Sequence, residues 1–438
     1  MRARQALPGL LLAIALRSTS AAAAPAAESP YDVLAQMARV LVMVEQEYVD
    51  PVERRRLTEG AIKGMVAELD PHSAYMPPED YGIFQSDTEG RFGGIGVEVD
   101  FGEDEITVIA PIEGSPAERA GIRSGDHIVA IDGRPVRGKS PEELVRAMRG
   151  AAGTKVSVSI RRTGMTELIV VKLTREVIEV SSVSGTLMEN EIGYVRIKQF
   201  QSGTHAELLE TVARLRKENR GPLAGVLLDM RNNPGGLVSE ATAVADEMLD
   251  GGVVFTTRHR KQVIDEVKAN RGGALQRGPL VVLVNEYSAS AAELVAGALQ
   301  DQKRATVVGA RTFGKGSVQT IVDLPGGAGL RLTSMRYYTP KGRAIQAQGI
   351  EPDVQVQAGV KPDKSFGVVR ESDLENHLPA EGKPEPAAPT AVSGAPSEAG
   401  ETDTHLGVAK EIPKNPTLGS DVALSVAYQI VTGVLPRR

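Results

Sequence analysis

A serine in the second half of the chain has the surroundings of a nucleophile. Ser290 follows the apolar run 279–284, which has the length and β-branched content of a buried strand, and directly precedes the amphipathic segment 291–300. It should therefore lie where a strand ends and a helix begins. Free N–H groups at a helix start stabilise an oxyanion that forms beside them, and the backbone N–H of Ala291 is the natural donor.

A lysine 25 residues later could activate this serine. Lys315 lies between Gly314 and Gly316 and follows Phe313, so small and apolar residues surround it. Desolvation lowers the pKa of a lysine, and a neutral lysine can take the proton of a serine hydroxyl. If the segment turns back on itself, the amide of Gln319 can orient the lysine amine as a third member.

Each of these residues also has a structural interpretation. Serine is favoured at Ser290 simply as a helix N-cap, and Lys315 taken alone could be a solvated loop lysine. Ser288 is a rival nucleophile, although on a strand-like approach it points to the opposite side from Ser290. The residues taken singly leave the choice open.

A longer segment carries a family resemblance. The sequence SASAAELVAGALQDQKRATVVGARTFGKGSVQ resembles the signature of the carboxyl-terminal processing proteases, also called tail-specific proteases, and the resemblance extends from about residue 31 to residue 354. It implies that Ser290 is the nucleophile, that Lys315 is the base and that Gln319 orients the lysine.

A second segment, LLDMRNNPGGLVSEA, resembles another part of the same family. A turn rich in asparagine, proline and glycine exposes backbone N–H groups. The resemblance implies an oxyanion hole in which Gly236, with Gly235 beside it, donates one hydrogen bond and Ala291 donates the other. Asp229 and Arg231 are interpreted as a structural pair.

Histidine offers no competing metal centre. No metal-binding spacing such as His-Glu-x-x-His occurs, so we expect neither a metal ion nor another cofactor. A Ser-His-Asp triad stays open on spacing alone, but no Gly-x-Ser-x-Gly elbow surrounds Ser290. His72 is interpreted as structural. The six histidines are His72, His127, His205, His259, His377 and His405.

Composition excludes several classes of protein. The chain has 438 residues, enough for two or three domains, and its net charge of −6 is too mild to indicate a nucleic-acid or membrane-surface partner. It contains no cysteine, which removes disulfides and cysteine catalysis.

The first residues have the layout of a secretory signal peptide. Arg2 and Arg4 precede the apolar run 7–16 and the small-residue stretch 21–27, and the run is shorter than the roughly 20 residues that span a bilayer. Residues 1–27 are therefore predicted to be a signal peptide, and the protein to be exported. It would be periplasmic in a Gram-negative cell and membrane-associated if the signal is not cleaved.

Short strands and glycine turns from about residue 89 are similar in order to a PDZ domain, predicted over residues 83–176. The loop Gly93-Gly94-Ile95-Gly96 resembles the carboxylate-binding loop of such domains. Its backbone N–H groups would capture the terminal carboxylate of a peptide that adds as a strand to the sheet edge.

The remaining segments complete a multidomain α+β chain. We predict an N-terminal helical region over 28–82, an α/β protease core with a mixed sheet over 177–360, a disordered linker over 361–418 and a C-terminal helix over 419–438. The resemblance implies that the N-terminal helices can contribute to a homodimer, and the C-terminal helix could dock back or pair with another subunit.

The sequence thus predicts an exported serine endopeptidase that recognises protein C-termini through a PDZ domain and cleaves with a Ser-Lys dyad through an acyl-enzyme. Its partners would be proteins or peptides with free C-termini, and an adaptor protein could deliver them. The alternative is a non-catalytic PDZ adaptor that presents protein tails to another protease or chaperone.

Overall fold

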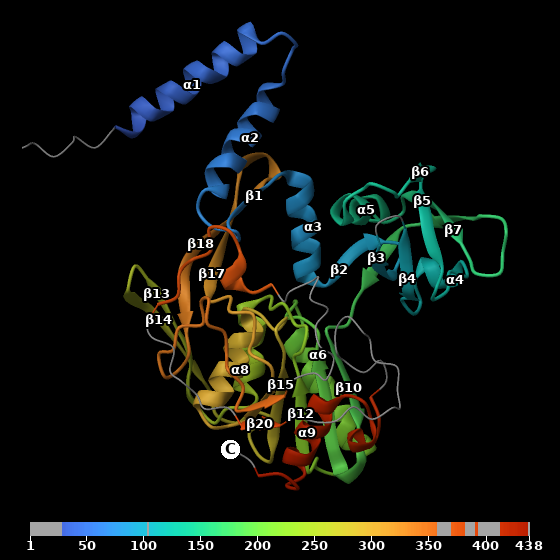
Figure 1. Ribbon diagram of the computed structural model, residues 1–438, viewed down its shortest axis with the longest axis vertical. Coiled ribbons are helices and arrows are strands. Elements are labelled where there is room, and N and C mark those ends of the chain that lie inside the picture. Colours follow the sequence, from blue (N-terminus) through green and yellow to red (C-terminus); the bar gives the residue numbers. More distant parts are fainter. Residues whose placement is uncertain (1–28, 103–104, 357–368, 382–389, 393–411, 437–438) are drawn as a thin grey trace, which may run out of the picture. The chain divides into compact units, whose positions relative to one another are not determined.

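The computed structural model describes residues 29–102, 105–356, 369–381, 390–392 and 412–436 (Figure 1). The predicted signal peptide, 1–27, lies outside the described residues. The chain forms two compact units, residues 1–62 and 63–438.

The N-terminal unit contains helix α1 (Pro30–Glu47) and the first part of α2 (Arg54–Ala67). Ser29 caps α1, because its hydroxyl oxygen accepts the N–H of Tyr31, and Pro30 occupies the first turn. The apolar face of α1 is exposed: Leu34 is 59% accessible and Met43 62%. The homodimer stays a prediction.

Among the helices of the described ranges, none is both long and apolar enough to cross a bilayer.

The region predicted as a PDZ domain, 83–176, largely coincides with a β-rich domain that residues 91–179 form. Its six-stranded sheet has the order β3-β4-β5-β7-β8, with β6 paired to β5. The first and last strands of the region, β2 and β9, form a separate antiparallel pair. Isoleucine, valine and leucine side chains fill its core beneath α4 and α5. Ser140 and Glu143 form a capping box at the start of α5. The elements are β2 (Arg91–Gly94), β3 (Val97–Phe101), β4 (Ile106–Pro111), α4 (Pro116–Arg119), β5 (His127–Ile131), β6 (Arg134–Pro135), α5 (Pro141–Met148), β7 (Lys155–Arg161), β8 (Ile169–Thr174) and β9 (Glu176–Glu179).

A seven-stranded mixed sheet forms the core of the second unit. Its order is β10-β11-β12-β15-β16-β19-β20, and only the β10–β11 pair is antiparallel. Parallel central strands are covered on both faces, so β15, Leu-Val-Val-Leu-Val, is buried along its whole length. The strands are β10 (Val183–Leu187), β11 (Ile192–Ile197), β12 (Gly225–Asp229), β15 (Leu280–Val284), β16 (Thr306–Gly309), β19 (Val354–Val356) and β20 (Thr390–Val392).

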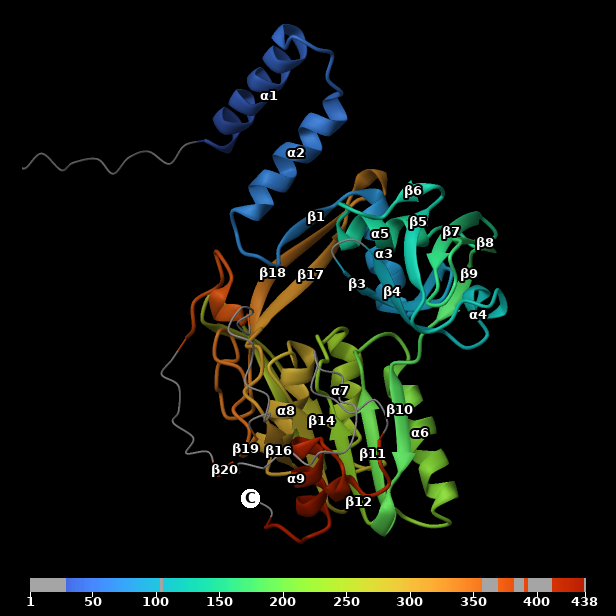
Figure 2. The ribbon, with the colours of Figure 1, turned by 45° about the vertical axis from the view of Figure 1, so that its right-hand side comes forward.

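Helices cover the two faces of this sheet. Alternate residues such as Leu228 and Val282 pack with α6 (Thr204–Glu218), α7 (Val238–Asp246) and α8 (Ala291–Asp301), whereas Leu227 and Val281 pack with α9 (Val422–Val431). Figures 1 and 2 show α9, coloured red, lying along β12. Leu424 and Ile430 of α9 are fully buried, and burial of each such side chain contributes about 1.5–3 kcal/mol to the free energy of unfolding. The C-terminal helix is therefore part of the core.

A second sheet carries the lysine segment. Its order is β1-β18-β13-β14, and β17 pairs with β18 along the other edge of that strand. The helix α3 (Pro78–Glu89) follows β1, and Tyr81 of α3 donates a hydrogen bond to Asp323 of β17. The strands are β1 (Ala74–Met76), β13 (Gly252–His259), β14 (Gln262–Ala269), β17 (Ser317–Asp323) and β18 (Gly329–Tyr338).

Part of the predicted linker, 361–418, lies within the described residues and makes defined contacts. Residues 369–381 pack against the core, and Glu371 is fully buried. Arg370 donates to the carbonyl oxygens of Arg311 and Thr312 (3.0 and 2.9 Å). The composition of the whole segment conceals these few contacts, which are made by individual polar side chains with residues about 60 positions away. The expected multidomain α+β architecture, with an N-terminal helical segment and a mixed-sheet core, is confirmed.

Candidate active site

Ser290 lies between β15 and α8 with a backbone that few non-glycine residues adopt, φ 54° and ψ −115°. Such conformations cost about 1–3 kcal/mol and persist only where surrounding contacts impose them. The rival Ser288 is fully buried; its Oγ donates to the carbonyl of Met230 and accepts the N–H of Asn285 (2.8 and 2.9 Å). Ser290 is partly exposed. The structure therefore favours Ser290 over Ser288 as the accessible hydroxyl.

The carboxylate of Glu293 holds Ser290 in this conformation. Its Oε2 accepts the backbone N–H of Ser290 (2.7 Å) and also the backbone N–H of Lys315 (2.9 Å). Its Oε1 accepts the hydroxyl of Thr312 (2.5 Å) and the N–H of Gly314 (2.8 Å). One side chain thus joins the serine turn to the lysine turn.

Glu293 is completely buried in the first turn of α8. Burial raises the pKa of its carboxyl to about 7, while the hydrogen bonds from Thr312, Gly314, Ser290 and Lys315 favour the charged form. All four groups donate hydrogen bonds to the Glu293 oxygens, and these bonds are stronger to the charged carboxylate than to the protonated carboxyl.

The glycine turn after β12 contacts Ser290. Gly235 and Gly236 have φ of 101° and 131°. A Cβ on Gly235 would lie 2.8 Å from Ser290 Cβ and 3.0 Å from the backbone nitrogen of Ala291, so glycine is required there. The N–H of Gly235 donates to Asn233 Oδ1. Within the described residues, the N–H groups of Gly236 and Ala291 have no hydrogen-bond acceptor.

A buried ion-pair network supports this turn. Arg231 makes several hydrogen bonds to Asp229, the closest at 2.6 Å, and a further one to Asp421, the N-cap of α9, at 2.9 Å. The carboxylates of Asp229 and Asp421 outweigh burial and hold the pKa of Arg231 above its usual range. The expected pairing of Asp229 with Arg231 is present.

Lys315 is a half-buried lysine on the turn between β16 and β17. Burial, reinforced by the nearby guanidinium of Arg331, lowers its pKa below the usual lysine value, although the carboxylates of Glu371, Glu293 and Asp70 act in the opposite direction. A larger fraction of this amine is neutral at a given pH than of a solvated lysine.

Gln319 lies on β17, four residues after Lys315. Its Nε2 donates to Ser317 Oγ (2.9 Å) and to Thr333 Oγ1 of β18 (3.3 Å). Both bonds use the amide nitrogen, which leaves the amide oxygen as an acceptor.

A buried pair next to the lysine turn involves a histidine. His72 Nε2 lies 2.7 Å from Glu371 Oε2, and Glu371 Oε1 accepts from Gln346, whose amide oxygen accepts the N–H of Gly316. None of the five histidines in the described ranges has a hydrogen bond with Ser290; the sixth, His405, lies outside them.

The glycine loop of the PDZ region has close packing contacts. A Cβ on Gly93 would lie 2.1 Å from the carbonyl oxygen of Gly150, and one on Gly96 (φ 76°) would lie 2.3 Å from Ser115 Cβ. Ile95 is buried, and Gly94 pairs with Glu176. Packing therefore accounts for glycine at both Gly93 and Gly96, and carboxylate binding by the loop stays a prediction.

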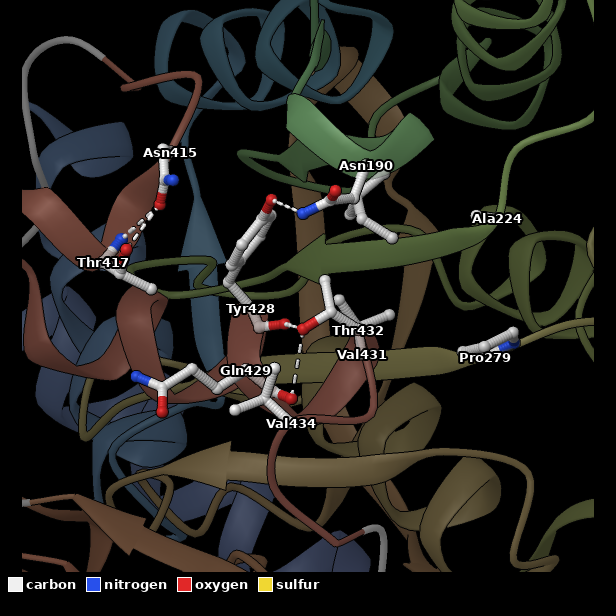
Figure 3. Close-up of a pocket in the computed structure, with 11 residues that line it drawn as sticks. Asn190, Ala224, Pro279, Asn415, Thr417, Tyr428, Gln429, Val431, Thr432 and Val434 are labelled. Carbon is white, nitrogen blue, oxygen red and sulfur yellow. Dashed lines mark hydrogen bonds between the residues drawn. The ribbon is translucent and has the colours of Figure 1, made fainter.

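A hollow of 740 Å³ lies next to α9, at the other end of the core sheet (Figure 3). It is lined by Ala224 and Pro279, which precede β12 and β15, and by Tyr428, whose hydroxyl accepts a hydrogen bond from Asn190. Ser290 instead follows the carboxyl end of β15, where ligands of open α/β sheets bind. The hollow is therefore not the candidate active site.

Sequence reasoning missed Glu293, Glu371 and Asp70. Glu293 carries one local signal, because it is the only charged residue in the apolar stretch SASAAELVAGAL. Asp70 forms a local turn with His72 and Ser73, but neither that turn nor the sequence around Glu371 indicates their distant contacts with Thr333 and Gln346.

Three family models match the chain: Peptidase family S41 over residues 191–356, PDZ domain over 107–162, and Activating protease CtpB N-terminal domain over 15–80. A carboxy-terminal-processing protease of Bartonella bacilliformis is 38% identical over 411 residues, which are 93% of this chain and 90% of the relative. A carboxyl-terminal-processing protease of Synechocystis is 38% identical over 323 residues, 72% of this chain and 75% of the relative.

Among solved structures, one described as an S41 protease from Bacteroides fragilis aligns with a TM-score of 0.52 at 15% identity, covering 91% of this chain and 98% of that chain. This is a likeness of fold. Together, the matches and the fold define a serine-type peptidase with an internal PDZ domain. The chain belongs to the carboxy-terminal-processing protease family.

The contacts of Glu293 predict that Glu293→Gln folds but is a poor enzyme. A glutamine in either amide orientation presents an NH₂ group to donors that now face a carboxylate oxygen. The resulting displacement of about 1 Å should lower kcat about 10²-fold, as measured by steady-state proteolysis.

Glu207→Gln is the matched control, because Glu207 also accepts two backbone N–H groups, those of Ser182 and Val183, at the edge of the core sheet. It should leave kcat nearly unchanged. Equal kcat values for Glu293→Gln and the unmodified protein would contradict the role of Glu293.

Proposed function

We propose that the chain is an exported endopeptidase that recognises protein C-termini through its PDZ domain and cleaves them with a Ser290–Lys315 dyad. The observation that carries this proposal is the shared Glu293 oxygen, which brings the backbones of Ser290 and Lys315 together although they are 25 residues apart. The lowered pKa of Lys315 and the glycine turn against Ser290 support it.

In the proposed reaction, neutral Lys315 takes the proton of Ser290 as Oγ attacks the carbonyl carbon of the scissile peptide bond. The N–H groups of Gly236 and Ala291, which have no acceptor in the part of the chain that the structure describes, donate to the oxyanion that forms. The protonated lysine then gives its proton to the leaving amine, and an acyl-enzyme remains. Lys315 then takes a proton from a water molecule as the water attacks the acyl carbon, and it gives that proton to Ser290 Oγ as the ester bond breaks. No metal ion takes part.

The proposed substrates are proteins and peptides with free C-termini. A strand of substrate would add to the PDZ sheet, and the loop Gly93 to Gly96 would hold its terminal carboxylate. The adaptor hypothesis uses the same PDZ contact but requires no reaction at Ser290, so loss of proteolysis in Ser290→Ala distinguishes the two.

The first prediction concerns the base. Lys315→Ala should lower kcat about 10²- to 10⁴-fold, the usual contribution of a general base. Lys315→Arg should be as inactive, because arginine does not deprotonate in this range. In the unmodified enzyme the neutral fraction of Lys315 grows as pH rises, so kcat should increase with pH and level off above the lowered pKa.

These rates are measured with casein as the substrate, with circular dichroism to check folding. Ser290→Ala is the inactive reference, and a chelator should have no effect on the unmodified enzyme. A Lys315→Arg enzyme with a near-normal rate, or inactivation by the chelator, would refute the dyad.

The second prediction concerns the chain end. A peptide that ends in an apolar residue with a free carboxylate should be cleaved about tenfold faster than its C-terminal amide, because charge-assisted hydrogen bonds to the carboxylate are lost. Gly94→Trp should abolish the difference. Equal cleavage of both peptides by the unmodified enzyme would rule out carboxylate recognition.

The third prediction concerns export. Removal of the predicted signal peptide should leave a mature N-terminus between about Ala22 and Glu28, which N-terminal sequencing of the exported protein would identify. A retained Met1 or Arg2 on that protein would indicate an uncleaved anchor instead.

A further inference from the structure

We propose that Asp70 and Thr333 are positioning residues that fix the orientation of the Gln319 amide and thereby direct its oxygen to the Lys315 amine. This inference rests on the proposed function, in which Lys315 is the base. It makes the segment Asp70-Pro71-His72-Ser73, nearly 250 residues away in sequence from Lys315, a part of the active site.

Asp70 is only 5% exposed and serves as the centre of a turn. Its Oδ1 accepts the backbone N–H groups of His72 and Ser73 (2.8 and 2.9 Å), and its Oδ2 accepts the hydroxyl of Ser73 (2.8 Å). These hydrogen bonds outweigh burial and lower the pKa of Asp70, so its carboxyl is charged at neutral pH.

The turn is fastened to β18. Thr333 donates its hydroxyl to Asp70 Oδ1 (3.0 Å), and its backbone N–H donates to Ser73 Oγ (3.0 Å). Arg331 donates to the carbonyl oxygen of His72 (2.8 Å). Thr333 therefore has one defined position and one defined hydroxyl direction.

The direction of that hydroxyl decides the direction of the amide. A threonine hydroxyl can donate only one hydrogen bond, and Thr333 donates it to the charged carboxylate of Asp70. The oxygen lone pairs of Thr333 can then only accept, and they accept Nε2 of Gln319 (3.3 Å). Ser317 Oγ also accepts Nε2 (2.9 Å), so this orientation leaves the amide oxygen Oε1 as an acceptor. In the proposed function, that oxygen accepts an amine N–H of Lys315.

The opposite amide orientation would disable the site. It would present an NH₂ group to the lysine amine, which could then bind it only through the lone pair that Lys315 needs for the serine proton. Asp70 thus acts on the lysine through two intermediate side chains, and also through its charge, which raises the pKa of Lys315.

The series of hydrogen bonds from Asp70 through Thr333 and Gln319 to Lys315, here called the relay, is tested by a double-mutant cycle on the full chain. Thr333→Val removes the acceptor with little change of shape and should lower kcat about tenfold, the effect of one lost hydrogen bond, with KM unchanged. Thr333→Ser keeps the hydroxyl and should restore the rate. In a Gln319→Ala background, Thr333→Val should cause no further loss, because it acts only through that amide.

Other outcomes overturn the inference. A Thr333→Val enzyme as fast as Thr333→Ser, or losses from Gln319→Ala and Thr333→Val that simply multiply, would remove the relay while inactive Lys315→Ala leaves the dyad standing. An active Lys315→Ala enzyme would instead overturn the proposed function.

Asp70→Asn provides a second measurement if Thr333→Val does not fold. Asparagine keeps Oδ1 but loses the charge. The other charged groups that act on Lys315, namely Arg331, Glu371 and Glu293, stay in place. Loss of the Asp70 charge should lower the pKa of Lys315, so the rise in kcat with pH should occur at lower pH. An unchanged pH dependence of kcat would contradict an influence of Asp70 on the base.

Discussion

The geometry of the candidate active site depends on one buried carboxylate, that of Glu293. Ser290 follows β15 and Lys315 follows β16, and these adjacent parallel strands bring both turns to the carboxyl edge of the core sheet. The two Glu293 oxygens accept donors from both turns, and Ser290 is held in an unfavourable backbone conformation that exposes its hydroxyl beside the glycine turn. Without that acceptor, the N–H groups of Ser290, Gly314 and Lys315 would be unsatisfied, and unsatisfied buried donors cost about 1–3 kcal/mol each.

Distant parts of the chain reinforce the same place. Asp421, the N-cap of the C-terminal helix, reaches Arg231 and through it Asp229, directly before the glycine turn. Glu371 holds the lysine turn through Gln346 and Gly316. Breaking one partner of a buried ion pair costs about 3–5 kcal/mol, so the C-terminal segments stabilise the geometry around Ser290 as well as the core.

The sequence predicted the elements whose signals are local. The apolar run at β15, the start of α8 at Ala291 and the glycines beside Lys315 all lie within a few residues of the groups they position, and the family resemblance named Ser290, Lys315 and Gln319. Glu371 was assigned to a linker although it contacts Gln346 and His72, which lie 25 and 299 positions away. Asp70 was passed over although it contacts Thr333, 263 positions away. Periodicity and composition carry no information about such contacts.

Stability and activity make opposite demands on Glu293. Its pKa of about 7 exceeds the usual value of 4.5, so the folded state holds this proton more tightly than the unfolded chain does. The stability that protonated Glu293 provides is complete below about pH 4.5 and is lost as pH rises towards 7. The proposed reaction needs the charged carboxylate of Glu293 and the neutral amine of Lys315, and the populations of both forms grow with rising pH. The site therefore reaches its working state at a pH where Glu293 is charged and its burial lowers the stability of the folded protein most. The hydrogen bonds from Ser290, Gly314 and Lys315 offset part of that cost, and they form only when both turns are in their active arrangement.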